Sequence, residues 1–164
     1  MLNEADMEQD PVKRIMKVAA FGIAQYKCTD GRLNKPFNPI LGETFELIGK
    51  DYKYFAEQVC HHPPVSACIA ENDHYKYHMD TNTQMGVSWS GTLKAVPIGF
   101  QHIVLQKSNE HYLIGRPTTT VNNLILGTMY IEHVGTMTVK NCANQMECPV
   151  EFKAAGWGNA GTHE

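Results

Sequence analysis

The sequence has little excess charge of either sign, no long apolar run and no signal-peptide pattern. Its 164 residues carry 14 Lys and Arg against 17 Asp and Glu, a net charge of −3, so it lacks the basic field of a nucleic-acid-binding protein. Its longest apolar stretches, such as residues 18–24, are far too short to span a bilayer. The N-terminal MLNEADMEQD is acidic and has no apolar core, so a signal peptide is not expected.

Cysteine pairs and the common catalytic motifs are also missing. The five cysteines are odd in number and form no Cys-x-x-C, which favours a reduced cytosolic chain over a disulfide scaffold. No Gly-x-Ser-x-Gly, Walker loop or His-Glu-x-x-His occurs. The composition, 43% hydrophobic and 19% charged, is globular, and the length fits one ordinary domain or a fragment of a larger one.

The N-terminal part predicts one helix. Residues 1–9 are expected to form a loose acidic lead. Asp10 and Pro11 form a good helix start, because Asp caps free amides and Pro suits the first helical position. The apolar spacing that follows predicts a helix over 11–27, ended by Thr29-Asp30-Gly31.

The rest of the chain is strand-like. Residues 32–43 hold two prolines and a glycine and are expected to form neither a helix nor a long strand. Beyond them, short apolar runs alternate with Gly, Asn, Asp and Pro, which is typical of antiparallel meanders that close as barrels or sandwiches. The candidate strands are 44–48, 52–58, 66–71, 75–79, 87–89, 92–96, 102–105, 111–114, 121–126, 129–133, 136–140 and 148–152.

The segment EQVCHHPP at residues 57–64 is the most unusual in the chain. A metal site of Cys60, His61 and His62 is disfavoured, because neighbouring side chains of an extended strand point apart and no partner pair has zinc-like spacing. Acid–base or nucleophilic catalysis by a cysteine beside a histidine is also disfavoured, because catalytic pairs are assembled in space and rarely adjacent in sequence.

An anion site is the third interpretation of this segment. Two imidazoles on a rigid turn can donate hydrogen bonds to phosphate, and do so more strongly when protonated. The segment 35–43 could complete such a site, since Lys35 offers a point charge and Asn38 a side-chain amide. The turn at 39–42 could aim backbone amides into a concavity. Each of these residues alone is more often structural.

Two motifs together resemble the oxysterol-binding protein family. They are KPFNPILGE at 35–43 and EQVCHHPP at 57–64. The second is similar to the family signature Glu-Gln-Val-Ser-His-His-Pro-Pro, with Cys60 in place of the usual serine. Residues 131–135 and 139–141 resemble a later strand pair of the family, so the resemblance extends over about 11–158.

The resemblance implies a mainly β fold: a large, incomplete antiparallel β-barrel with an N-terminal helix. It implies a lipid-binding domain that exchanges phosphatidylinositol 4-phosphate for a sterol or another lipid between membranes, without covalent chemistry or a cofactor. The protein would be cytoplasmic and peripheral at membranes, at endoplasmic reticulum or Golgi contact sites. Family domains are longer, so residues 1–164 are expected to form a single partial domain with strands over 44–158, a short or missing lid and no C-terminal head-group ligands.

The resemblance also implies ligand contacts, carried over residue by residue. Gln25 and Tyr26 correspond to sterol-contacting positions of some members. The phosphoinositide-binding residues would be Lys35, Asn38, Leu41 through its backbone amide, Glu43 as a turn holder or head-group contact, His61 and His62.

Two other functions stay open at this point. A membrane phosphoinositide-sensing or tethering module would bind the head group without extracting the lipid. A histidine-dependent hydrolase would turn over its substrate, but no catalytic constellation in the sequence supports it.

Overall fold

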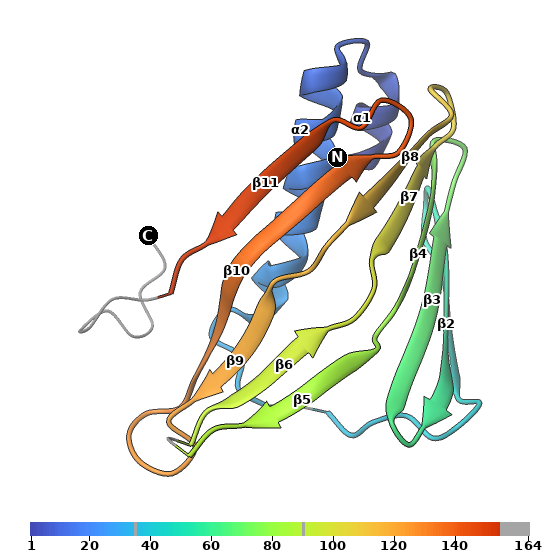
Figure 1. The fold of residues 1–164 in the computed structure, drawn as a ribbon. Coiled ribbons are helices and arrows are strands. Elements are labelled where there is room, and N and C mark those ends of the chain that lie inside the picture. The colour runs from blue at the N-terminus through green and yellow to red at the C-terminus, as the bar shows by residue number, and fades with distance from the viewer. Residues whose placement is uncertain (35, 90, 155–164) are drawn as a thin grey trace.

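The chain folds as two helices packed against one long, curved antiparallel sheet (Figure 1). The fold is given by a computed structural model, which describes residues 1–34, 36–89 and 91–154. The helical elements are α1 (Leu2–Met7), α2 (Pro11–Ala24) and the 3₁₀ helix η1 (Gln25–Thr29). The strands are β1 (Thr44–Ile48), β2 (Lys53–His61), β3 (Pro64–Glu71), β4 (Tyr75–Asp80), β5 (Thr83–Val87), β6 (Leu93–Pro97), β7 (Gln101–Leu105), β8 (Glu110–Ile114), β9 (Thr118–Asn122), β10 (Tyr130–Asn141) and β11 (Glu147–Phe152).

The strands form one open sheet in the order β1-β2-β3-β4-β7-β8-β10-β9-β6-β5, with β11 added beside β10. Every pairing is antiparallel. Within the described ranges, β1 pairs only with β2 and β5 only with β6, so the sheet is not closed. The expected mainly β, incomplete antiparallel architecture with an N-terminal helix is therefore confirmed.

Several short strands are halves of longer ones that bend. Tyr75 pairs with Leu105 and Val87 with Leu93, so β4–β5 and β6–β7 form one long hairpin in a single register. The amide of Ile98 donates to the carbonyl of Asn82 at 2.9 Å across the interruption. The two ends of the hairpin therefore belong to one continuous, bent layer of the sheet.

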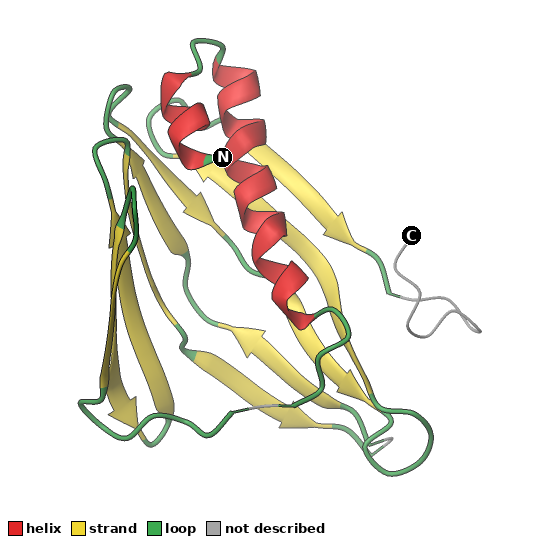
Figure 2. Cartoon of the chain, turned by 180° about the vertical axis from the view of Figure 1, so that it is seen from behind, coloured by secondary structure: helices red, strands yellow, loops and turns green. Residues whose placement is uncertain are grey.

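The local sequence explains where α2 begins and which of its faces is buried. The Asp10 carboxylate accepts hydrogen bonds from the amides of Val12 and Lys13 at 2.8 and 3.4 Å, and Pro11 is the first helical residue. The helix packs on β8, β10 and β11 (Figure 2), and we call the sheet face that carries it the inner face. The buried hydrophobic core is Leu2, Ala5, Ile15, Val18, Ala19, Tyr77, Ile103, Leu105, Tyr112, Ile114, Met137 and Val139.

The N-terminal residues differ from the expected loose lead. Residues 2–7 form α1, whose Leu2 and Ala5 belong to the core. The Asp6 carboxylate is buried and accepts hydrogen bonds from the Lys107 amide at 2.8 Å and from His74 Nδ1 at 2.9 Å. The acidic composition of residues 1–9 therefore concealed a docked helix, because the partners of Asp6 lie far along the chain.

Other boundaries are also corrected. The helix expected over 11–27 is α-helical only to Ala24 and continues as the 3₁₀ helix η1. The strands expected at 87–89 and 121–126 lie earlier in the chain, as β5 and β9, which end at Val87 and Asn122. The apolar residues expected to end these strands lie outside them. The strands expected at 129–133 and 136–140 are one strand, β10, which passes through Gly135 at a φ of +100°.

The expected end of the strand region at residue 158 stays a prediction. The last described strand ends at Phe152, and residues 155–158 lie outside the described residues. None of the helices in the described ranges is long and apolar enough to cross a membrane.

Candidate phosphate-binding site

The structure joins the 36–43 loop to the end of β2. Gly42 N donates to Gln58 O at 2.9 Å, and Gln58 N donates to Glu43 O at 3.0 Å. The loop is closed by Glu43, whose carboxylate accepts from Ile40 N at 2.9 Å and whose amide donates to Ile40 O at 3.0 Å. Gly42 has a φ of +78°, which a side chain would disfavour. Glu43 thus holds the turn, and its expected contact with the head group stays a prediction.

His61 and His62 lie at the turn between β2 and β3. His61 pairs with Pro64, so the turn consists of His62 and Pro63. The two imidazole rings are 4.7 Å apart, edge to face. His61 is half-buried and His62 is exposed, so both can meet a ligand that approaches from solvent.

One hydrogen bond connects His61 directly to the loop. Its Nδ1 lies 3.1 Å from the carbonyl oxygen of Pro39. Because a carbonyl only accepts, the proton of this bond is on Nδ1. In the described part of the chain Nε2 of His61 has no hydrogen-bond partner. Protonation of the ring would make Nε2 a donor suited to an anion.

Gln58 holds this arrangement from within the sheet. Its side chain is only 2% exposed and donates from Nε2 to Cys60 O at 2.9 Å. Its Oε1 accepts a hydrogen bond from the Ser66 hydroxyl. The register of β2 shifts between Gln58 and Cys60, which leaves Val59 as a bulge. Such bulges re-aim the following side chains, so Gln58 fixes how His61 leaves the sheet.

Sequence reasoning assigned no role to Gln58. The signal that could have found it is a glutamine inside an apolar strand pattern, directly before the histidine pair, because a buried amide needs partners on both of its polar atoms.

Two of the other residues expected to bind the head group lie on the exposed loop. Asn38 and Leu41 lie on the exposed loop, and Leu41 is 66% exposed. Across the described ranges, the Leu41 amide donates no hydrogen bond, so it is available to an anion. Lys35 lies outside the described residues. The described ranges contain no group of three His, Cys, Asp or Glu side chains that could hold a metal ion.

The expected sterol contacts lie in a different place. Gln25 and Gln101 exchange two amide hydrogen bonds of 2.9 Å each. The Tyr26 ring lies 4.6 Å from the ring of His133 and 5.2 Å from that of Phe152. Burial raises the pKa of Tyr26 to about 12, so its hydroxyl is neutral near pH 7. Both residues hold the end of α2 on the inner face, in contact with β7, β10 and β11.

The inner face also carries apolar side chains that α2 does not cover. Phe45 and Leu47 of β1 pair with Ala56 and Tyr54 and are 57% and 41% exposed. On β5, Met85 is 58% exposed. Together with the polar site at the β2–β3 turn, these surfaces offer an apolar wall and a polar end, the combination that amphiphilic ligands need.

Known proteins resemble the chain in both sequence and fold. The family model described as oxysterol-binding protein matches residues 1–164. Mouse oxysterol-binding protein-related protein 3 is 36% identical over 168 residues, which cover 100% of this chain and 20% of that protein. The chain thus spans about a fifth of the length of this relative.

Solved structures resemble the chain over nearly its whole length. The Osh3 ORD of Saccharomyces cerevisiae, solved in complex with PI(4)P, aligns with a TM-score of 0.83 and 29% identity over 94% of this chain and 42% of that one. The Osh1 ORD domain in complex with cholesterol aligns with a TM-score of 0.87 and 30% identity over 97% of this chain and 39% of that one.

Proposed function

Because the chain belongs to the oxysterol-binding protein family, we propose that it binds phosphatidylinositol 4-phosphate and, in exchange, a sterol or another lipid. In this proposal the protein carries lipid between membranes without a covalent step or a cofactor. It acts in the cytoplasm as a peripheral protein at endoplasmic reticulum or Golgi contact sites.

The observation that carries the proposal is the hydrogen bond between His61 Nδ1 and Pro39 O. It joins the two sequence motifs into one exposed surface of imidazoles and loop amides. Phosphate binds well to such a surface, because backbone amides and protonated imidazoles are donors without competing negative charge.

The proposed phosphate ligands are His61, His62, Asn38, the Leu41 amide and Lys35. Glu43 shapes the loop, since its carboxylate accepts from the Ile40 amide. The acyl chains would lie along the apolar inner face beside Phe45 and Leu47. For the second ligand, the proposal assigns contacts to Gln25 and Tyr26, where the paired amides of Gln25 and Gln101 could be shared with a hydroxyl group.

The proposal is supported by the ligands named for the solved relatives, PI(4)P for the Osh3 ORD and cholesterol for the Osh1 ORD domain. The test is extraction of fluorescent phosphatidylinositol 4-phosphate from liposomes by the wild type and by the double variant His61→Ala, His62→Ala. His78→Ala is the matched control, because His78 is an exposed histidine on the opposite face of the sheet.

Extraction by the wild type and the control, but not by the double variant, is the expected result. A folded wild type that binds the vesicles and leaves the lipid there would instead be a sensing or tethering module. Equal extraction by all three proteins would remove the histidines from the site. Circular dichroism of each protein should confirm that it is folded.

A further inference from the structure

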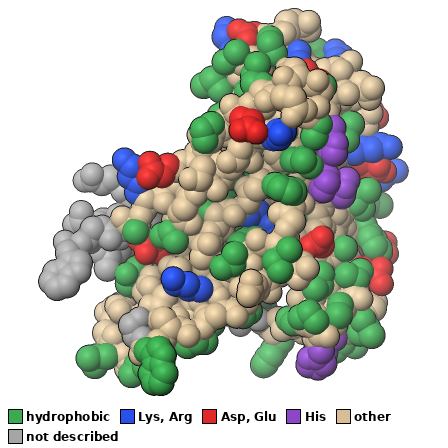
Figure 3. Space-filling view, viewed as in Figure 1, with side chains coloured by type: hydrophobic (Ala, Val, Ile, Leu, Met, Phe, Trp, Pro, Cys, Tyr) green, Lys and Arg blue, Asp and Glu red, His purple; other side chains and the backbone are tan. Residues whose placement is uncertain are grey.

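Two neighbouring turns of the sheet carry strongly exposed apolar side chains. Trp89, in the turn after β5, is fully exposed, and Ile125 and Leu126, in the loop between β9 and β10, are 78% and 87% exposed. Leu124 N donates to Gly91 O at 3.1 Å, so the two turns touch. We call Trp89, Ile125 and Leu126 the apolar tip. Figure 3 shows hydrophobic side chains gathered at this end of the molecule.

The chain segments that form the apolar tip contain no charged residue. Residues 81–93 and 117–131, which form the two turns and their flanking strands, contain no Asp, Glu, Lys or Arg. Exposed turns usually carry polar and charged residues. Two uncharged turns that expose Trp, Ile and Leu side chains therefore form an unusual surface. A contiguous apolar patch of this kind marks an interaction site.

The tip and the candidate phosphate site lie at the same end of the sheet. Ala67 of β3 pairs with Asp80 of β4, next to the β2–β3 turn. Since β5 continues β4 beyond the bend, the turn after β5 and the β2–β3 turn both lie at the lower end of the sheet in Figure 1. A flat surface approaching this end would meet both.

We propose that the apolar tip inserts into the interfacial layer of a lipid bilayer and orients the protein so that the phosphate site faces the head groups. This inference rests on the proposed function, which supplies the membrane ligand. Trp is suited to the interface, because its ring is apolar and its N–H stays near water, while Ile and Leu reach the acyl chains. A second protein would require a broad face of about 800 Å², whereas these side chains stand at the ends of two turns.

The experiment makes Trp89 the only tryptophan, whose fluorescence is excited selectively. The chain contains two tryptophans, so Trp157→Phe leaves Trp89 alone. Its fluorescence is measured on phosphatidylcholine vesicles whose acyl chains carry bromine near the head group or near the bilayer centre, with and without phosphatidylinositol 4-phosphate. We expect quenching mainly by the shallow bromines. Ile125→Ser with Leu126→Ser should weaken vesicle binding by about tenfold or more, because apolar burial drives such insertion.

The matched control is Ile48→Ser. Ile48 is 82% exposed, but it pairs with Lys53 at the start of β2, at the end of the sheet away from the apolar tip and the phosphate site. Its replacement should therefore leave vesicle binding unchanged. Circular dichroism of all variants keeps misfolding from imitating a loss of binding.

The outcomes separate this inference from the proposed function. The proposed insertion of the apolar tip would be overturned if the protein bound vesicles with phosphatidylinositol 4-phosphate while Trp89 stayed unquenched. Absence of quenching on every vesicle would also overturn it. A tip substitution that changes only self-association in sedimentation would show that a second copy is the partner and would overturn it too. Quenching that persists although His61→Ala, His62→Ala has no effect on lipid preference would support the tip and contradict the phosphate site.

Discussion

The Nδ1 atom of His61 lies 3.1 Å from the carbonyl oxygen of Pro39, 22 residues earlier in the chain. This bond ties the β2–β3 turn to the loop before β1 and places a proton on Nδ1. With Nδ1 engaged as a donor, the imidazole can donate to a phosphate only from Nε2, and Nε2 carries a hydrogen only when the ring is charged. A phosphate that accepts a hydrogen bond from Nε2 therefore requires the charged ring.

The first prediction is that His61→Ala weakens affinity for a soluble head group, glycerophosphoinositol 4-phosphate, by about tenfold or more. The substitution removes the imidazole donor, and a hydrogen bond to a charged group contributes about 1.5–3 kcal/mol. Titration calorimetry of the wild type and the variant measures this difference.

The conservative variant His61→Gln tests whether a donor at this position is sufficient, because a glutamine amide can also donate a hydrogen bond. Its affinity should lie between those of His61→Ala and the wild type. Equal affinity of His61→Ala and the wild type would remove His61 from the site.

The second prediction concerns Gln58. Gln58→Leu leaves the carbonyl of Cys60 and the hydroxyl of Ser66 without the partners that the buried amide provides. Leaving buried polar groups unpaired costs about 1–3 kcal/mol, so urea denaturation should show a loss of this size. Head-group affinity should fall as well, because the bulge that aims His61 is no longer held.

The control for this prediction is Gln84→Leu, an exposed glutamine of β5, for which little change in stability is expected. A Gln58→Leu protein that loses stability but keeps full head-group affinity would limit Gln58 to a structural role.

Local chemistry explains what the sequence could predict. The cap of Asp10, the Pro11 start and strand β1 depend on neighbouring residues, and the structure has them where the sequence placed them. The loop and the histidine turn meet, as the two motifs indicated through the family resemblance.

Long-range partners explain what the sequence could not predict. Helix α1 depends on Asp6 meeting His74 and Lys107, and the role of Gln58 depends on Ser66 in the next strand. At Trp89 and residues 124–126, apolar side chains favoured strands because such residues are usually buried. In the structure they are exposed turns, which suggests that their apolar character serves an external contact.

The third prediction concerns a row of histidines on the face opposite α2. The His102 ring stacks on His78 at 4.4 Å, and His102 Nδ1 lies 3.0 Å from His111 Nε2. Burial, reinforced by the neighbouring charges of His78 and His111, lowers the pKa of His102, and Asp80 opposes the shift. The unfolded chain therefore takes up this proton more readily than the folded one.

Stability should consequently be lost as pH falls below the ordinary histidine value of about 6.5. His102→Gln should lose less than the wild type over the same interval, as measured by urea denaturation at a neutral and a mildly acidic pH. An identical loss in both proteins would assign the acid sensitivity to other groups.

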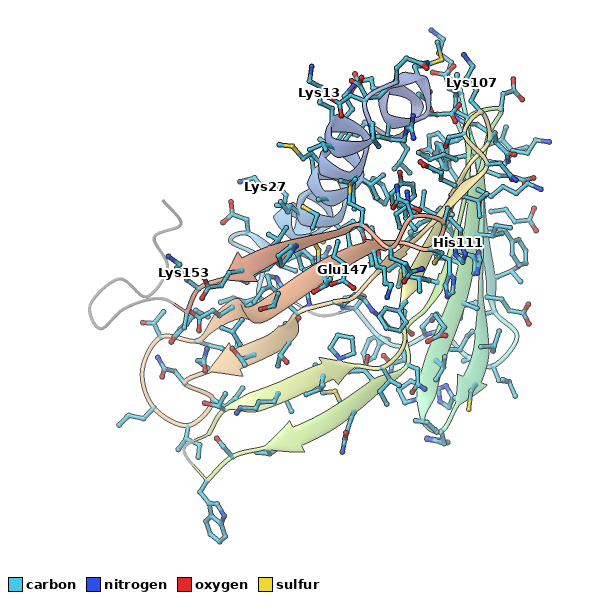
Figure 4. All side chains as sticks on the ribbon, turned by 45° about the horizontal axis from the view of Figure 1, so that its top comes forward. Lys13, Lys27, Lys107, His111, Glu147 and Lys153 are labelled. Carbon is cyan, nitrogen blue, oxygen red and sulfur yellow. The ribbon has the colours of Figure 1, made fainter. Side chains whose placement is uncertain are left out.

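The fourth prediction concerns the ion pair that fixes α2 to the sheet. Arg14 Nη1 lies 2.7 Å from Glu110 Oε2, and the two side chains are only 11% and 15% exposed. Removing one partner of a buried pair leaves the other charge uncompensated, so Arg14→Met should destabilise the fold by about 3 kcal/mol. Lys13→Met is the control, because Lys13 points away from the sheet on the exposed side of α2 (Figure 4).

The pH dependence of the stability lost in Arg14→Met identifies how much of that loss is electrostatic. Burial tends to raise the pKa of Glu110, but hydrogen bonds from Tyr112 and Arg14 outweigh it and hold the pKa below its usual range. A carboxylate with a lowered pKa stabilises the fold above its unfolded value and loses this contribution as pH falls through the folded one. The difference in unfolding free energy between the wild type and Arg14→Met should therefore shrink below about pH 4. A difference that stays constant with pH would mean that Arg14 acts through the packing of its aliphatic stem.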